Sequence, residues 1–209
     1  HTKCKMVSYV HSCYGDNSQL SYGRMKNKMY EIIFQKAFDV SDAVIAVSKA
    51  GEKSYEQVYS VPQGKKYIVY NGIGSELINT GKQNVIDGCQ PYKLLYIGRL
   101  NKIKGVDLLL RAVSTLKNDY ELQLSIVGDG PERETLESLM GDLGLEHIVC
   151  FCGESMDIQK YLSNADIFIY PSTCQEVFGI SLVEALSYGV PCVANCLGGI
   201  PEIIQDGYN

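Results

Sequence analysis

Short apolar segments alternate with amphipathic segments of helical periodicity along almost the whole of this 209-residue chain. This alternation is typical of a parallel sheet with helices on both faces, and the unbroken apolar runs indicate strands buried on both sides. The predicted strands cover residues 7–10, 43–47, 67–70, 94–97, 122–127, 148–152, 167–170 and 191–194. The predicted helices cover about 22–38, 49–59, 106–116, 131–143, 155–162, 179–188 and 200–205, with Ser48 and Ser155 as expected N-caps. The sequence therefore predicts an α/β protein with doubly wound, Rossmann-like parallel sheets.

The two halves of the chain carry opposite charge. Residues 1–105 have 15 Lys and Arg against 8 Asp and Glu, whereas residues 106–209 have 4 against 16. The glycine-containing stretch 73–92 is the expected linker between two domains. We therefore expect residues 1–72 to be the C-terminal part of one Rossmann-like domain, and residues 93–209 to be a second such domain, truncated at its C-terminus. The abrupt ends of the chain suggest a piece of a longer protein.

Composition narrows the class of protein. Hydrophobic residues make up 45% of the chain, which rules out a disordered protein, and no apolar run approaches the ~20 residues of a spanning helix. No run of basic residues interleaved with aromatic ones is present, so no nucleic-acid partner is expected. The basic side chains of the first half form either a solvated face or a peripheral contact with an anionic membrane. They include Lys3, Lys5, Arg24, Lys26, Lys28 and Lys36.

The eight cysteines show neither a CxxC pair nor the spacing of a zinc site. Cys150 and Cys152 alternate with Phe151, so both thiols are expected on one face of a strand. A chain of this length builds its core without disulfides. We therefore expect reduced thiols in a cytoplasmic protein.

Basic residues follow one of the predicted strands. In open parallel sheets ligands bind at the carboxyl ends of the strands, so the loops after residues 97, 127, 152, 170 and 194 should line one mouth. Arg99 and Lys104 lie in the first of these loops. They are either a clamp for a diphosphate or solvated cations near a helix start, where the helix dipole opposes them.

Two carboxylates flank a glycine-started helix. Glu176 precedes Phe178-Gly179-Ile180, and Glu184 lies eight residues after Glu176. A helix N-terminus offers amides to a phosphate, and carboxylates bind hydroxyl groups beside it. The alternative is an ordinary helix with one acidic residue before it and one exposed glutamate.

The turn Gly128-Asp129-Gly130 resembles the start of a dinucleotide fingerprint, but the later glycine of that pattern is absent. Glu132 and Glu134 would also repel a pyrophosphate from the following helix. We interpret the segment as a tight turn, and not as a dinucleotide site.

Together these residues resemble the retaining glycosyltransferases of family 4, which have the GT-B fold and use nucleotide-sugar donors. The resemblance covers nearly the whole chain, and in the first half it lies in residues 41–48 and 70–73. In the second half it comprises Gly98-Arg99-Leu100, Lys104-Gly105, Val127-Gly128-Asp129-Gly130-Pro131, Phe151-Cys152-Gly153, Pro171-Ser172, Glu176, Phe178-Gly179, Glu184-Ala185, Gly189, Pro191, Gly198-Gly199 and Glu202.

The resemblance implies a role for each site residue. Gly98, Arg99 and Lys104 would bind the donor diphosphate, and Phe178, Gly179 and Ile180 would offer backbone amides to the phosphates and the sugar. Glu176 would bind the transferred sugar and Glu184 the ribose. His11 would lie beside the reacting sugar, although a strand-end histidine also makes local hydrogen bonds. His147, at a strand start, is expected to be structural.

Charge on the leaving diphosphate would be stabilised by these groups without a metal, and no DxD-like pair is present. We expect neither a metal nor a cofactor, because the nucleotide sugar is a substrate. The resemblance implies retention of configuration and a glycan, lipid-linked or polysaccharide acceptor. The paired carboxylates also suit a glycosidase, but the adjacent phosphate-type site disfavours it.

The sequence departs from the family where Gly74 follows Ile73 in place of an aspartate. Segments before residue 1 and after residue 209 are expected to be missing, so this piece alone is not expected to be fully active. Two other functions stay open: a GT-B relative such as a nucleotide-sugar epimerase, and a non-catalytic nucleotide-binding or scaffold domain.

Overall fold

The computed structural model describes residues 4–12, 24–75 and 91–207. By its internal packing the chain divides into two compact units. Unit 1 contains residues 1–72, 175–179 and 197–202, and unit 2 contains residues 73–174, 180–196 and 203–209. Residues 76–90 of the expected linker, and the expected helix start at residue 22, lie outside the described residues.

Unit 1 is built on a three-stranded parallel sheet in the order β1-β2-β3. The strands are β1 (Val7–Val10), β2 (Ala43–Ala46) and β3 (Lys66–Ile68). Helix α1 (Arg24–Val40) connects the first two, and α2 (Lys49–Glu56) with the short 3₁₀ helix Gln63–Lys65 connects the second and third. Because both connections are crossovers of the β-α-β kind, the parallel arrangement predicted for this part is confirmed.

Aromatic side chains hold α1 and α2 in the core of unit 1. The ring of Phe38 on α1 packs against the rings of Tyr55 and Tyr59, with centroids 5.8 and 5.2 Å away. Tyr55 is fully buried, and burial raises the pKa of its hydroxyl to about 12. Ser48 caps α2 as predicted, since its hydroxyl accepts the N–H of Gly51 at 2.9 Å.

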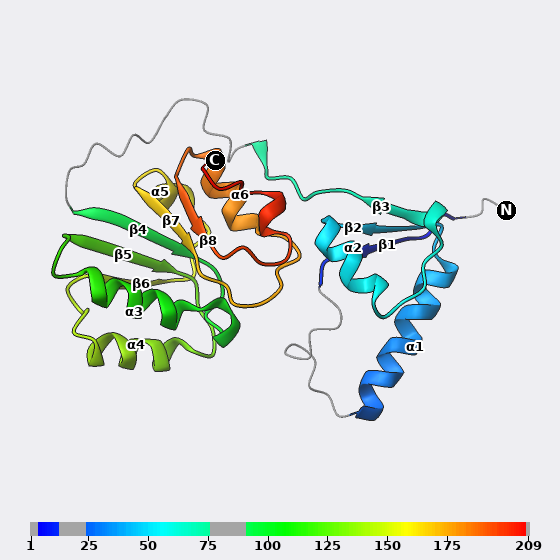
Figure 1. Ribbon diagram of the computed structural model, residues 1–209, viewed down its shortest axis with the longest axis horizontal. Helices are drawn as coiled ribbons and strands as arrows, with labels where there is room; N and C mark the ends of the chain where they lie inside the picture. Colours follow the sequence, from blue (N-terminus) through cyan, green and yellow to red (C-terminus); the bar gives the residue numbers. More distant parts are fainter. Residues whose placement is uncertain (1–3, 13–23, 76–90, 208–209) are drawn as a thin grey trace. The chain divides into compact units, whose positions relative to one another are not determined.

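Unit 2 is a five-stranded parallel sheet in the order β6-β5-β4-β7-β8 (Figure 1). The strands are β4 (Tyr92–Ile97), β5 (Leu122–Val127), β6 (Val149–Gly153), β7 (Ile167–Tyr170) and β8 (Cys192–Ala194). The chain runs outward from β4 to β6 and then returns to build β7 and β8 on the other side. The order therefore reverses between β4 and β7, the kind of position at which doubly wound sheets bind ligands.

Helices cover both faces of this sheet. Helices α3 (Val106–Leu116) and α4 (Arg133–Asp142) lie side by side on one face, and α6 (Ile180–Ser187) lies on the other (Figure 1). The short helix α5 (Gln159–Leu162) precedes β7. The core beneath α3 and α4 includes Tyr96, Leu100, Leu110, Ile126 and Leu145, each at most 1% exposed. The doubly wound α/β architecture is confirmed.

Four element predictions need correction. The helix predicted over 49–59 ends at Glu56. The helix predicted from Ser155 begins at Gln159, because the Ser155 hydroxyl instead accepts the nearby N–H of Asp157 at 3.2 Å. The helix predicted over 200–205 is a 3₁₀ turn, Ile200–Glu202. The strand predicted over 67–70 ends at Ile68, and only the N–H of Val69 still bonds to β2. None of the helices in the described ranges is long and apolar enough to cross a bilayer.

Candidate functional site

Backbone hydrogen bonds join the loops that follow β4, β5 and β6. The N–H of Gly128 donates to the carbonyl of Gly153 at 2.8 Å, and the N–H of Leu100 donates to the carbonyl of Asp129 at 2.9 Å. Gly128 has a φ of +131°, and a Cβ there would lie 2.0 Å from the Gly98 carbonyl oxygen. Close approach of the loops therefore requires these glycines, which supports the interpretation of residues 128–130 as a tight turn.

The loops after β7 and β8 join the same group. The carbonyl of Ile103 accepts hydrogen bonds from the N–H of Thr173 at 2.9 Å and from the Ser172 hydroxyl at 3.2 Å. The side-chain amide of Asn195 donates to the carbonyls of Pro171 and Ser172 at 3.1 and 2.9 Å. Five loops therefore gather at the carboxyl ends of the unit 2 strands, and we call them the mouth. The sequence-based expectation of one shared mouth is confirmed.

A pocket of about 770 Å³ opens at the β4–β5–β6 side of the mouth. Its wall includes Gly98 and the exposed Arg99, whose carbonyl accepts a hydrogen bond from the Tyr96 hydroxyl at 3.1 Å. The full lining is Ile97, Gly98, Arg99, Val127, Gly128, Asp129, Gly130, Glu154, Ser155 and Met156. This volume lies within the range of small-molecule sites.

The carboxylate of Asp129 in this pocket is paired. Arg133 donates to Asp129 at 3.1 Å and to Glu137 at 2.8 Å, and these hydrogen bonds, the Glu137 bond foremost, raise the pKa of the Arg133 guanidinium. Arg99 makes no ion pair with any residue that the structure describes. The guanidinium of Arg99 is therefore the cation at this pocket that is available to an anionic ligand.

Lys104 lies in the 3₁₀ turn Lys102–Lys104, on the β7 side of β4. Its ammonium is 5.6 Å from the centre of the Tyr170 ring, a cation–π distance. Gly105 ends this turn with a φ of +68°, and a Cβ there would lie 2.2 Å from the Pro171 carbonyl oxygen. The turn is thus held against the loop after β7, at the reversal point of the strand order.

Two of the predicted site residues belong to α6. Ile180 begins the helix and is exposed, and Glu184 lies one turn later, partly buried. Burial raises the pKa of the Glu184 carboxyl. The chain thus keeps a carboxylate where desolvation disfavours its charge, which is more common at functional sites than elsewhere.

Three other predicted site residues belong to unit 1: Glu176, Phe178 and Gly179. Glu176 is only 9% exposed, and its carbonyl accepts the N–H of Gly199 at 2.6 Å. A Cβ at Gly198 would lie 2.2 Å from that same carbonyl oxygen, so the Gly198-Gly199 pair allows the close approach. The ring of Phe178 lies 6.3 Å from the ring of Tyr70.

His11 follows β1 and is exposed. Its ring stacks on that of Tyr9, with centroids 4.6 Å apart and planes inclined by 25°. This ring contact differs from the local hydrogen bond that the sequence left open for this histidine, and that alternative stays a prediction. The role of His11 beside the reacting sugar stays a prediction.

Glu202 has a role that the sequence did not reveal. Its carboxylate accepts the backbone N–H groups of Lys49 and Ala50 at 2.9 and 2.8 Å, and also the Tyr70 hydroxyl at 2.9 Å. A carboxylate at the first turn of α2 satisfies orphan amides and complements the helix dipole. The hydrogen bond to Glu202 raises the pKa of Tyr70. Glu202 matched the family pattern, but no local signal linked it to a helix 150 residues earlier.

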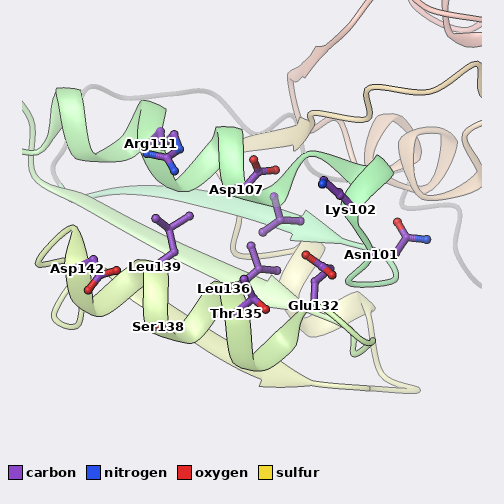
Figure 2. Close-up of a pocket in the computed structure, with 11 residues that line it drawn as sticks. Asn101, Lys102, Asp107, Arg111, Glu132, Thr135, Leu136, Ser138, Leu139 and Asp142 are labelled. Carbon is purple, nitrogen blue, oxygen red and sulfur yellow. The ribbon is translucent and has the colours of Figure 1, made fainter. Parts of the chain in front are cut away.

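A second pocket, of about 600 Å³, lies between α3 and α4 (Figure 2). Lys102 and Arg111 line it together with Asp107, Glu132 and Asp142, so both signs of charge face it. None of the predicted site residues contributes to its wall. No functional role follows from this pocket.

The structure places no group of three or more His, Cys, Asp or Glu side chains close enough to hold a metal ion, within the ranges described above. The expectation that neither metal nor cofactor is needed stays a prediction.

Comparison with known proteins identifies the family. The profile described as "Glycosyl transferases group 1" matches residues 82–209, and the one described as "Glycosyltransferase Family 4" matches residues 1–77. The first match covers more than half of the chain, so the protein belongs to the glycosyl transferases group 1 family.

Particular relatives agree with this assignment. The chain is 30% identical over 228 residues to an uncharacterized glycosyltransferase, MJ1607, of Methanocaldococcus jannaschii, covering 99% of this chain and 56% of that protein. It is 38% identical over 120 residues to the GDP-mannose-dependent alpha-(1-6)-phosphatidylinositol monomannoside mannosyltransferase of Mycolicibacterium smegmatis, covering 53% of this chain and 31% of that protein. The chain thus spans about half, or less, of the length of these relatives.

Solved structures show the same fold. Anabaena Alr3699/HepE, solved with UDP and glucose, matches with a TM-score of 0.83 and 24% identity, covering 98% of this chain and 56% of that one. The predicted fold, a Rossmann-like α/β unit with part of a second one, of the GT-B type, is confirmed.

Proposed function

We propose that the protein is a glycosyltransferase that moves a sugar from a nucleotide-sugar donor to an acceptor with retention of configuration. Family membership supports the reaction class. The observation that carries the proposal is the mouth of unit 2, where a pocket of about 770 Å³ presents the exposed guanidinium of Arg99. A pocket of this volume with one guanidinium in its wall suits a ligand with an organic body and a diphosphate.

The leaving diphosphate gains negative charge as the sugar–phosphate bond breaks. Arg99 and Lys104 lie in the segment that follows β4 and are proposed to stabilise that charge, together with the backbone amides of Gly179 and Ile180. Lys104 lies over the Tyr170 ring, which limits its motion and so lowers the entropy lost when it meets a phosphate. We propose that these groups act without a divalent metal.

The sugar and ribose are proposed to be bound through their hydroxyls. Glu176 is proposed to contact the transferred sugar and Glu184 the ribose, because ionised carboxylates accept hydrogen bonds from hydroxyl groups. Phe178 would contact the donor, and His11 would lie beside the reacting sugar. Retention would follow from attack by the acceptor on the face that the diphosphate leaves, with the leaving phosphate taking the acceptor proton.

The nucleobase and the acceptor are open parts of the proposal. The Anabaena structure contains UDP and glucose, and the M. smegmatis relative is named for GDP-mannose. We propose a glycan, lipid-linked or polysaccharide acceptor, as in polysaccharide biosynthesis. A cytoplasmic location, with peripheral membrane contact through the basic residues of the first half, is also proposed.

Donor turnover tests the proposal. The protein is incubated with UDP-, GDP- and ADP-hexoses, and the anomeric form of the first sugar product is followed by proton NMR. We expect one donor to release its sugar or transfer it with the α or β configuration unchanged, and Glu176→Gln to reduce the rate by about 100-fold or more. The matched control, Glu134→Gln, changes an exposed glutamate on α4 and should not alter the rate.

Two results would contradict the proposal. An inverted product would remove the claim of retention. Nucleotide binding with no turnover of any of these donors would instead indicate a scaffold function.

A further inference from the structure

Two thiols lie side by side on an edge strand of unit 2. Cys150 and Cys152 belong to β6, which ends the sheet and, among the strands that the structure describes, pairs with β5 alone (Figure 1). Their sulfur atoms are 3.8 Å apart, and Cys152 is placed to donate a weak hydrogen bond to the Cys150 sulfur. Cys150 is exposed and Cys152 is partly exposed, so reagents from solution reach this pair.

A β-bulge brings these sulfurs together. Ile126 of β5 pairs with Phe151, but the next residue, Val127, pairs with Gly153, so Cys152 is the extra residue on the bulged strand. In a regular strand, residues two apart are separated by about 6.6 Å between Cα atoms, which is near the upper limit for a disulfide. A bulge bends the strand and shortens this span, so the distortion favours a bond between the two sulfurs.

We propose that Cys150 and Cys152 form a reversible dithiol–disulfide pair that adjusts the pocket wall. The oxidant is a low-molecular-weight disulfide such as glutathione disulfide. The Cys150 thiolate attacks one of its sulfurs, forms a mixed disulfide and releases one glutathione. The Cys152 thiolate then attacks the Cys150 sulfur, forms the Cys150–Cys152 bond and releases the second glutathione. Two electrons pass from the protein to the oxidant, and the two thiol protons leave on the two glutathione molecules.

The surroundings assign different roles to the two thiols. Cys150 is the more exposed and meets the oxidant first. Burial, and then the neighbouring Cys150, raise the pKa of the Cys152 thiol, whereas hydrogen bonds with Tyr161 and Ser125 act in the opposite direction. A thiol of this kind reacts slowly with outside reagents but quickly with a sulfur already beside it. Cys152 therefore resolves the mixed disulfide.

The pair is coupled to the pocket through the residues that follow it. Gly153 accepts the N–H of Gly128 at 2.8 Å, and both glycines lie at the carboxyl ends of their strands. Glu154, Ser155 and Met156 come next in the chain and line the pocket of about 770 Å³. Closing the disulfide pulls Cys152 toward Cys150, so it shifts Gly153 and the wall formed by residues 154–156. The consequence for donor binding rests on the proposed function.

Mass spectrometry tests the bond itself. Trypsin releases residues 134–160 as one peptide, and Cys150 and Cys152 are its only cysteines. After glutathione disulfide treatment of the native protein, we expect this peptide to be lighter by two hydrogen atoms, and dithiothreitol to restore it. Cys150→Ser should abolish the change, whereas Cys196→Ser, which removes another exposed thiol of unit 2, should preserve it. A peptide that stays reduced or carries only glutathione would overturn the proposal.

Amide hydrogen exchange tests the coupling without any ligand. We expect oxidation to change the exchange of residues 153–158 in the native protein but not in Cys152→Ser. Donor affinity should fall at least about fivefold on oxidation, within the usual range of couplings between sites. Unchanged exchange and affinity in a protein that forms the disulfide would overturn the regulatory role. A nucleotide that binds neither form would overturn the proposed function, while the mass and exchange results would still decide the disulfide.

Discussion

Unit 2 covers both faces of its sheet with its own helices, whereas unit 1 leaves much apolar surface exposed. Among the described residues, 12 of the 18 large exposed apolar side chains belong to unit 1, including Val7, Tyr9, Ile32, Ile33, Val40 and Tyr67. The other six belong to unit 2, and one of them, Met156, lines the pocket. Unit 2 therefore builds a core covered by its own helices and a pocket lined by its own residues, whereas the described sheet and helices of unit 1 leave apolar side chains exposed.

The largest difference between the units is expected for substitutions of their apolar residues. Leu110 is fully buried in the core beneath α3 and α4, and Ile32 on α1 is half exposed. Leu110→Ala should lower the free energy of unfolding of unit 2 by about 2–5 kcal/mol, because it leaves a cavity. Ile32→Ala should change that of unit 1 by no more than about 0.5 kcal/mol. Hydrogen exchange at increasing denaturant concentrations measures the free energy of unfolding of each unit. A large loss of stability in Ile32→Ala would show that another part of the protein covers Ile32.

The glycines of the two units should also differ. Gly128→Ala places a Cβ against the Gly98 carbonyl at a φ of +131°, and it should cost about 1–3 kcal/mol and distort the pocket. The matched control in unit 1 is Gly64→Ala, where a Cβ would meet nothing within 4 Å. Thermal unfolding of the two variants compares them directly. Equal stabilities of Gly128→Ala and Gly64→Ala would contradict this prediction, because they would mean that the loops around Gly128 and Gly98 can move apart at no cost.

Glu202 tests whether unit 1 depends on its long-range helix cap. Glu202→Ala leaves the N–H groups of Lys49 and Ala50 without their carboxylate, so it should destabilise α2 by about 1–2 kcal/mol. Faster amide exchange in residues 49–56 would report this loss. Glu31→Ala, at an exposed position on α1, is the control and should leave that exchange unchanged.

The smallest effect is expected from Glu184 of unit 2. Burial raises its pKa above 4.5, so the folded protein holds this proton more tightly than the unfolded chain does. The stability that the protonated Glu184 contributes is therefore lost as the pH rises from its pKa in the unfolded chain to its higher pKa in the folded protein. Glu184→Gln should match the natural protein at about pH 4 and be the more stable of the two at about pH 7. Denaturant titrations at both pH values measure this, and an unchanged difference would contradict the burial of this carboxylate.

The sequence predicted the regular parts of unit 2 closely, because their patterns are local. Helix Val106–Leu116 and strands Leu122–Val127 and Ile167–Tyr170 have the predicted bounds. In unit 1, Ser48 caps a helix as predicted. The mouth could also be predicted, since it follows from the direction of parallel strands. The prediction that Ser155 caps a helix was wrong, because a serine near a turn can instead accept a hydrogen bond from a nearby backbone N–H, here that of Asp157.

Long-range contacts were beyond sequence reasoning. The bonds of Glu202 to the start of α2 join residues more than 150 apart, and nothing near either segment encodes the pairing. The bulge at Cys152 depends on how β6 pairs with β5, which alternation alone does not reveal. The site roles of His11, Glu176 and the donor-binding residues remain predictions, because they concern a substrate.

Calorimetric titration with UDP, GDP and ADP and their hexose conjugates tests the central claim that the mouth of unit 2 binds a nucleotide sugar. We predict that one nucleotide binds and that Arg99→Ala weakens it about 10- to 100-fold, because a charge-assisted bond to phosphate is lost. Arg111→Ala, which removes an exposed guanidinium from the pocket between α3 and α4, should leave the affinity unchanged. Equal affinities of the natural protein and Arg99→Ala, or no binding by a folded sample, would contradict the claim.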